Sequence, residues 1–381
     1  GTAAEIQAAY TTANTAGTIS GLGNENISIS DTGTLASSTI TSLDVSTTGT
    51  ITLNGAGSLV LTTTSGQILD LSGVTNSLSG TLSITDSTGN ETITGTSAND
   101  TLTLSSGNDT INLGNGSDTI NATIGNLDVN DNISDTGSTG TDVLNITNSG
   151  TIDSANLIDA KGIETLNLSS GNDTITFDDT TEFNAFRNNF TDIVDAGGSD
   201  TLSFGTTAVS GDLDFSKLSE FETLNLSSAS DNLTISGDEP TNINGLGGDD
   251  QFTLDFSTVR NLDGGTGTDT VKFTGTTSSI SADTAFAPSS TFTNIERLDI
   301  SGLNLNTSDN NTEFNFTEAM LDAWTGSDTG SLTLSLTSSQ VEKIKFTDSS
   351  SVVHDTSSTI TDNTSYTIGN NTLTIDIIDV P

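Results

Sequence analysis

Acidic side chains recur at every ninth residue in one part of the sequence. Four successive units read GNETITGTS, ANDTLTLSS, GNDTINLGN and GSDTINATI, and they place their acids at Glu91, Asp100, Asp109 and Asp118. Each acid is followed by Thr and then by Ile or Leu. Carboxylates at a fixed spacing among glycine-containing turns offer the oxygen ligands that a hard divalent cation such as Ca²⁺ prefers. The spacing therefore predicts metal-binding chemistry.

A longer repeat follows the short one. The same order of acids occurs twice, with 22 residues from an Asp to a Glu and nine more to a second Asp, at Asp142–Glu164–Asp173 and at Asp200–Glu222–Asp231. A looser third copy pairs Asp269 with Glu296. Recurrence on this scale is typical of stacked coils. We expect the three glutamates to cap strands or to bond to a neighbouring coil, and a metal role is the alternative.

The elements that position these acids are short strands separated by turns. In a strand, side chains alternate between the two faces, so the aliphatic residue of each unit can point inward while Thr points outward. Two units make one coil of 18 residues, which places Asp100 over Asp118 on one edge and Glu91 over Asp109 on the other. Carboxylates stacked about 5 Å apart repel each other by roughly 1–3 kcal/mol, depending on the effective dielectric. A cation between the coils reverses the sign of that interaction.

Composition supports bound cations and excludes several other partners. The chain has 381 residues, 50 acidic and 8 basic side chains and a formal net charge of -42, which makes nucleic acid and anionic membranes poor partners. Acidity of the halophilic kind is the alternative, but that acidity is spread over a surface. With one His and no Cys, the chain offers little to zinc or copper, so calcium is the expected cofactor. No apolar run reaches transmembrane length. Because the first residue is Gly1, we expect a fragment or a processed product that lacks a leader or an anchor.

One segment resembles the RTX calcium-binding nonapeptide, G-G-x-G-x-D-x-U-x with U aliphatic. The segment GGTGTDTVK, residues 264–272, fits this pattern fully, and GSTGTDVLN, residues 137–145, lacks one Gly. The units at 89–121 keep G-x-D-x-U in most copies. The resemblance covers roughly residues 89–300 and implies an all-β fold, a parallel β-solenoid or β-roll with short helical insertions.

In that family, the Asp carboxylates and the turn carbonyls coordinate calcium. The resemblance carries this role to seven residues of the chain: Asp100, Asp109, Asp118, Asp142, Asp173, Asp200 and Asp269. Three further acids precede members of this set and could complete the same sites: Asp135, Asp195 and Asp263. For each Asp, and for Asp231 above all, the alternative is a turn-forming residue that binds no metal.

The coarse organisation divides the chain into four segments. Residues 1–16 predict a short helical lead-in or linker, and 17–88 predict N-terminal solenoid coils. Residues 89–300 predict the RTX-like solenoid, with a helical insertion near 181–194 that sets Phe183, Phe186, Phe190 and Ile193 on one face. Residues 301–381 predict a C-terminal β region or cap, with a short helix near 317–324. We expect both helices to cover the apolar core.

The function that fits best is structural. The resemblance favours a calcium-dependent, self-assembling bacterial surface protein, most like an S-layer protein. It also implies secretion to the cell surface by type I export. A segment of a large secreted RTX adhesin is the alternative. The expected partner is the protein itself, with cell-surface polysaccharide as a further possibility, and neither nucleic acid nor a membrane span is expected.

Other functions have weaker support. A polysaccharide-degrading β-solenoid enzyme would need a carbohydrate cleft, but the chain has one Trp and two Tyr, and neither H-E-x-x-H nor G-x-S-x-G occurs. We therefore expect no catalytic residue and no enzyme activity. His354 is expected at the surface. An ice-binding face built from the Thr rows would need many more copies of the repeat.

Overall fold

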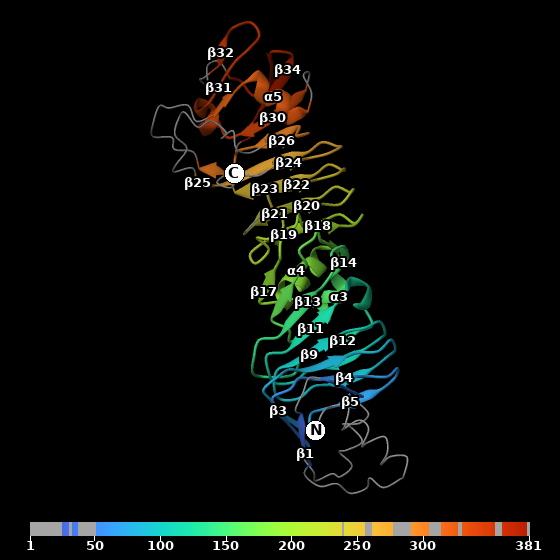
Figure 1. Cartoon of the computed structure of the whole chain (residues 1–381). Helices are drawn as coiled ribbons and strands as arrows, with labels where there is room; N and C mark the ends of the chain where they lie inside the picture. The colour runs from blue at the N-terminus through green and yellow to red at the C-terminus, as the bar shows by residue number, and fades with distance from the viewer. Residues whose placement is uncertain are drawn as a thin grey trace. The chain divides into compact units, whose positions relative to one another are not determined.

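The computed structural model describes residues 25–29, 33–36, 51–237, 240–255, 261–276, 291–304, 314–326, 330–354 and 360–378. Short strands, most of them parallel, stack as a β-solenoid with a few short helices, which confirms the predicted fold class (Figure 1). The chain divides into two compact units. The N-terminal unit contains Gly1–Ile175 and Ala185–Gly198, and the C-terminal unit contains Thr176–Asn184 and Ser199–Pro381. The helix predicted at 1–16 lies outside the described residues, and the predicted segment boundaries stay a prediction.

The N-terminal unit is built from parallel sheets. The largest has the order β17-β15-β13-β11-β9-β7-β4-β2. Its strands are β2 (Gly33–Ala36), β4 (Leu59–Thr62), β7 (Leu82–Thr85), β9 (Asp100–Thr103), β11 (Thr119–Ala122), β13 (Val143–Ile146), β15 (Thr165–Asn167) and β17 (Asp192–Val194). A second sheet, β12-β10-β8-β5, contains β5 (Ile68–Asp70), β8 (Thr92–Thr94), β10 (Thr110–Asn112) and β12 (Asn132–Ile133). A third sheet, β1-β3-β6, contains β1 (Glu25–Ile29), β3 (Ile51–Gly55) and β6 (Val74–Leu78).

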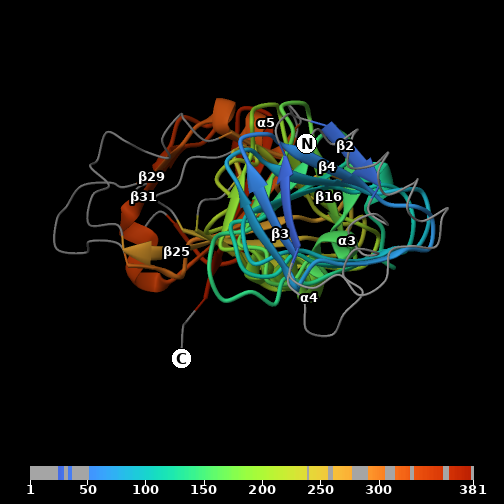
Figure 2. The ribbon, with the colours of Figure 1, turned by 60° about the horizontal axis from the view of Figure 1, so that its bottom comes forward.

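The C-terminal unit repeats this construction. One set of parallel strands comprises β18 (Thr201–Phe204), β20 (Thr223–Asn225), β22 (Asn242–Asn244), β24 (Asn261–Asp263) and β26 (Thr291–Thr293). A second sheet runs β19-β21-β23-β25-β27-β30-β34-β33. Its strands are β19 (Ser210–Asp214), β21 (Asn232–Ser236), β23 (Gln251–Asp255), β25 (Thr270–Thr276), β27 (Arg297–Asp299), β30 (Ser331–Leu336), β33 (Thr364–Ile368) and β34 (Asn371–Ile377), and β28 (Leu303–Asn304) pairs with β25. A small sheet joins β29 (Phe314–Phe316), β31 (Ile344–Thr347) and β32 (Val353–His354), and Figure 2 shows β29 beside β31.

The register of the sheets keeps identical positions of successive coils in line. Thr119 pairs with Thr101, and Ile120 pairs with Leu102. On the other edge of the coil, Ile111 pairs with Ile93. The aliphatic members of these pairs are at most 1 % exposed. A one-residue slip would turn each row of aliphatic side chains out of the core, so the apolar pattern fixes the register.

Helices appear where the coils are interrupted. They are η1 (Ile124–Asn126), α3 (Ser154–Ile158), α4 (Thr180–Asn189), α5 (Glu318–Thr325) and η2 (Ser338–Lys343), and the remaining strands are β14 (Thr151–Asp153) and β16 (Thr174–Phe177). Helix α4 is shorter than the predicted insertion, because Asp192–Val194 pairs with β15 as β17. The β-branched residues of that stretch favour a strand. Among the described residues, no helix combines the length and the apolar character needed to cross a membrane.

Aromatic side chains of the helices complete the core, as expected. Phe183 of α4 packs on Phe177 and Phe215 with ring centroids 5.4 Å from each. Thr317 caps α5 by accepting the N–H of Met320, and Trp324 of α5 lies 5.5 Å from Phe292, edge to face. These contacts bury large rings where the sheet alone would leave the coil interior open.

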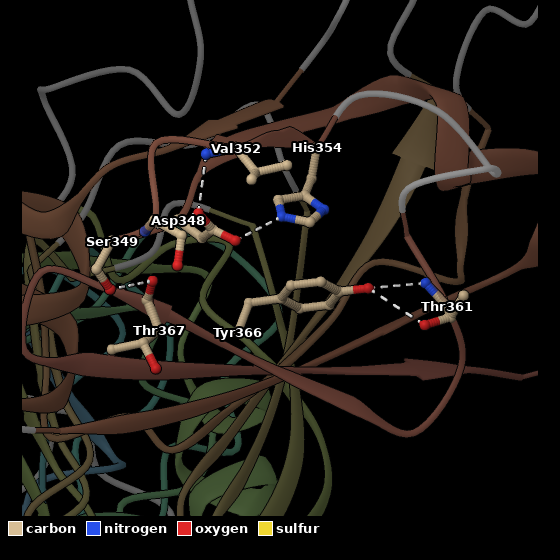
Figure 3. A network of polar contacts seen from close by, with 8 residues as sticks. Asp348, Ser349, Val352, His354, Thr361, Tyr366 and Thr367 are labelled. Carbon is tan, nitrogen blue, oxygen red and sulfur yellow. Dashed lines mark hydrogen bonds and ion pairs between the residues drawn. The ribbon is translucent and has the colours of Figure 1, made fainter.

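The sole histidine is buried and not at the surface as expected. His354, labelled in Figure 3, is 7 % exposed. Its ring stacks on that of Phe346, with the ring centroids 4.8 Å apart. Its Nε2 lies 2.9 Å from Oδ2 of Asp348, and this hydrogen bond is the main cause that lowers the pKa of Asp348. Tyr366 contacts the imidazole ring edge to face at 4.5 Å, and its hydroxyl accepts the N–H of Thr361. The group holds β32 and β33, which pair antiparallel with β31 and β34, against the last coils.

Candidate metal centre

The in-line acids face the inside of the coil. Asp100, Asp109 and Asp118 are each 1 % exposed. In β9 the burial alternates along the strand, so that the Asp and the Leu of Asp-Thr-Leu share the inner face while Thr faces outward. The same alternation that places the aliphatic side chain in the core therefore also draws the carboxylate out of water.

The carboxylates form hydrogen-bonded ladders from coil to coil. The backbone N–H of Asp100 donates to Oδ1 of Asp118 at 2.7 Å, and the N–H of Asp118 donates to Oδ1 of Asp142 at 2.7 Å. On the opposite edge, the N–H of Glu91 donates to Oδ1 of Asp109 at 2.8 Å. The predicted stacking of Asp100 with Asp118 and of Glu91 with Asp109 is confirmed. Backbone amides therefore supply part of the stabilisation of these carboxylates, in addition to any bound cation.

A comparable ladder runs through the C-terminal unit. The N–H of Val209 donates to Asp231 at 2.6 Å, the N–H of Asp231 donates to Asp250 at 2.8 Å, and the N–H of Asp250 donates to Asp269 at 2.9 Å. At the end of the ladder, the N–H of Asp269 donates to Oε2 of Glu296 at 2.8 Å. Asp231, Asp250 and Asp269 are at most 1 % exposed.

The three repeat glutamates bond to the preceding coil, which was one of the two roles expected for them. Glu164 accepts the N–H of Asp142 at 2.8 Å, and Glu222 and Glu296 make the same contact to Asp200 and Asp269. In each case the N–H of the Glu and that of the next residue both point at the carbonyl oxygen of the Asp. Two amides opposite one carbonyl resemble a bulge. The additional methylene of Glu lets the carboxylate span this wider step.

Several buried carboxylates keep one oxygen without a hydrogen-bond donor. Among the described residues these oxygens include Oε2 of Glu91 and Oδ2 of Asp109, Asp118, Asp250 and Asp269. Desolvation raises the pKa of Asp109, Asp118 and Asp250 to about 7 and that of Asp269 to about 6, and neighbouring carboxylates add to the rise. An unpaired buried charge costs several kcal/mol. These oxygens therefore need either a proton or a cation.

One cluster brings three acids together at close range. Oxygens of Asp86, Glu91 and Asp109 lie within 4.8 Å of one another, and all three residues are buried. Gly66 N–H donates to Glu91 at 2.6 Å, and Thr63 donates to Asp86 at 3.1 Å. The donor set contains only oxygen, and two of its oxygens lack a partner, so it fits calcium and lacks the nitrogen or sulfur that zinc prefers.

The acids that precede the repeat aspartates lie close to them. Asp135 is among the charges that raise the pKa of Asp142, and Asp263 is among those that raise the pKa of Asp269. Oxygens of Asp173 and Asp195 lie within 4.8 Å of each other. Asp135, Asp195 and Asp263 therefore each lie near a repeat aspartate.

Sequence reasoning missed some acids and included others that are already bonded. Asp86, Glu91, Asp131 and Asp250 belong to the ladders or the cluster but were not among the ten predicted ligands. Asp86 stands five residues before Glu91, as Asp195 does before Asp200, so the rule that found Asp195 would have found Asp86. Conversely, both oxygens of Asp100 accept bonds from Thr96, and Oδ2 of Asp173 accepts two bonds from Ser169. Asp200, another of the ten predicted ligands, is fully buried.

Identical local sequences give different sites. The heptapeptide SSGNDTI occurs at 105–111 and at 169–175. In the second copy, Ser169 donates to Asp173 of its own turn. In the first copy, the N–H of Ser105 donates to Asp86 instead, at 3.2 Å, and Oδ2 of Asp109 is left without a donor. The neighbouring coil therefore decides whether a turn satisfies its own aspartate.

Comparison with known proteins agrees with this geometry. Residues 85–120 match the model of the RTX calcium-binding nonapeptide repeat over four copies, a span that includes Asp86, Glu91, Asp100, Asp109 and Asp118. No curated protein and no solved structure is detectably similar to the chain. RTX repeats are calcium-binding and are typical of secreted extracellular proteins. With the ladders and the oxygen-only cluster in place, this chain is a β-solenoid protein that carries RTX calcium-binding repeats.

Proposed function

We propose that the chain is a calcium-stabilised structural protein of the bacterial cell surface that assembles with copies of itself, as an S-layer subunit does. The observation that carries the proposal is the set of buried carboxylate oxygens without donors in both units. Calcium is abundant outside cells and scarce inside them. A chain that needs calcium to neutralise its interior would stay unfolded before export, for which we propose the type I route, and would fold outside.

The distribution of charge supports self-association. Between residues 51 and 127 the chain has six acids and no basic residue. Five of the six are buried, namely Asp86, Glu91, Asp100, Asp109 and Asp118, which leaves Asp70 exposed. The outward residues of β9 and β11 are Thr and Asn. Two copies of a chain with a net charge of -42 can approach each other most easily through such an uncharged surface.

A segment of a secreted adhesin is the second candidate, and the divergence of the coils argues against it. We further propose that the chain has no catalytic role, because the acids that are brought together lie inside the coil, where they bond to backbone amides. Cell-surface polysaccharide is a proposed additional partner.

The test measures folding and assembly together. Far-UV circular dichroism and light scattering are recorded on calcium-stripped protein and again in millimolar calcium. We expect calcium to produce a β spectrum and then particles whose size grows with protein concentration. A β spectrum without particles favours the adhesin segment. Identical spectra in the two conditions would show that folding does not depend on calcium.

A further inference from the structure

The ladder aspartates differ in what their carboxylates contact within their own turn. In the turn of Asp231, Ser227 donates its N–H to Oδ2 at 3.0 Å and its hydroxyl to Oδ1 at 2.8 Å. In the turn of Asp100, Thr96 donates its N–H to Oδ2 at 2.6 Å and its hydroxyl to both oxygens at 3.0 and 3.1 Å. The donor stands four residues before the Asp in both turns. We call these turns closed, and that of Asp173, with Ser169, is a third.

Other turns of the same ladders have no such donor. Asp250 follows Asp231 in its ladder and accepts the Asp231 N–H through Oδ1, but its Oδ2 has no hydrogen-bond partner. Asp118 stands in the same relation to Asp100. Both residues are 1 % exposed, so water cannot reach the unpaired oxygen freely. We call these turns open.

The backbone four residues before the Asp explains the difference. In the open turns this residue is Gly114, with φ +90°, or Leu246, with φ +69°. Thr96 and Ser227, at the same place in the closed turns, have negative φ. A left-handed residue aims its N–H in another direction, and Gly114 donates to Asp135 and not to Asp118. The open turns therefore lack both the hydroxyl and the amide that satisfy the closed ones.

We infer that a Ser or Thr that stands four residues before a ladder aspartate and donates to its carboxylate takes the place of a calcium ion. Ser105 stands four residues before Asp109 but donates to Asp86, so it does not close its turn. Closed turns, such as those of Asp100 and Asp231, then bind no calcium, whereas the open turns of Asp118 and Asp250 do. This inference rests on the proposed calcium-stabilised function and names which turns carry the ions. A carboxylate that already accepts an N–H and a hydroxyl must lose those bonds to ligate a cation, whereas an unpaired oxygen loses nothing.

Two neighbouring substitutions test the inference. Asp250→Asn and Asp231→Asn alter positions 19 residues apart in one ladder, and in both variants the amide oxygen can still accept the backbone N–H of the preceding coil. Calcium per chain is measured by elemental analysis after dialysis against fixed free calcium. We expect Asp250→Asn to lose one ion per chain, or to need about tenfold more calcium for it, and Asp231→Asn to match the wild type. The pair Asp118→Asn and Asp100→Asn should give the same contrast in the N-terminal unit.

Each other outcome has a definite meaning. Equal calcium binding by both members of each pair, whether lowered or unchanged, overturns the inference while calcium binding by the wild type stands. Loss only in the closed-turn variants does the same. A wild type that binds no calcium overturns the proposed function, and the inference falls with it. Circular dichroism in saturating calcium checks that each variant is folded. If one pair fails to fold, the pair in the other unit decides.

Discussion

After calcium is removed, the N-terminal unit should be more stable in mild acid than at neutral pH. Burial raises the pKa of Asp118 from an ordinary value of 3.8 to about 7, and that of Asp109 similarly. A folded pKa above the unfolded one means that the folded state holds the proton more tightly. Above pH 7, ionisation of the buried Asp118 carboxyl therefore lowers the free energy of unfolding by on the order of 4 kcal/mol. Two such groups approach the whole stability of a domain, about 5–15 kcal/mol.

The expected result is a gain of stability as the pH falls from about 8 towards 4, most of it below pH 7. Each of these carboxyls should contribute up to about 1.4 kcal/mol per pH unit. Protein stripped of calcium and then freed of chelator is brought to pH 5, 6, 7 and 8. Circular dichroism records its β content at each pH and, wherever it is folded, its unfolding in urea. In saturating calcium the dependence should be lost or reversed, because protons compete with the ion.

Asp118→Asn provides the decisive variant, and Asp70→Asn, at an exposed acid, is its control. The first substitution should stabilise calcium-free protein at pH 8 and flatten the pH dependence, whereas the second should do neither. A calcium-free wild type that loses stability steadily between pH 7 and pH 5 would refute the reasoning, because the buried carboxylates would then be stabilised as anions by the amide ladder alone.

Three further predictions concern the coil architecture. Glu164→Asp should lower the free energy of unfolding by about 1 kcal/mol, because the shorter side chain cannot reach the N–H of Asp142, while Glu164→Gln should change it little in urea unfolding. Gly107→Ala should abolish cooperative unfolding, since the new Cβ would lie 1.4 Å from a carbonyl oxygen of the preceding coil, while Gly125→Ala, with open space around it, should behave as the wild type. His354→Ala should increase proteolysis of the C-terminal strands without changing calcium binding, measured by limited digestion and dialysis.

Much of the fold was predictable because it depends on local periodicity. The alternation in Asp-Thr-Ile and the nine-residue spacing suffice to stack Asp100 over Asp118, and the stacking is as expected. The end of α4 was not predictable from apolar spacing. Ile193 fits the helical face of Phe186 and Phe190, but it lies in a strand because a parallel partner is available in β15. Tertiary pairing overrides the helical pattern there.

The chemical type of the metal ligands was predictable from the sequence, but which individual acids are free to bind was less predictable. The type of ligand follows from the acids themselves, and their position follows from the repeat. Whether a given carboxylate has a free oxygen depends on donors from other residues, such as Thr96 for Asp100. His354 shows the same limit, because its burial depends on Phe346 and Tyr366, whose approach no local pattern reveals.

The hydrogen bond from the N–H of Ser105 to Asp86 has an evolutionary consequence. Asp86 lies outside the heptapeptide that contains Asp109, so a substitution there can change what that turn binds while every residue of the turn stays the same. Homologous chains with identical repeats can thus drift apart in the number of ions they require. Their tolerance of calcium-poor surroundings would then vary through single changes that a comparison of repeat motifs passes over.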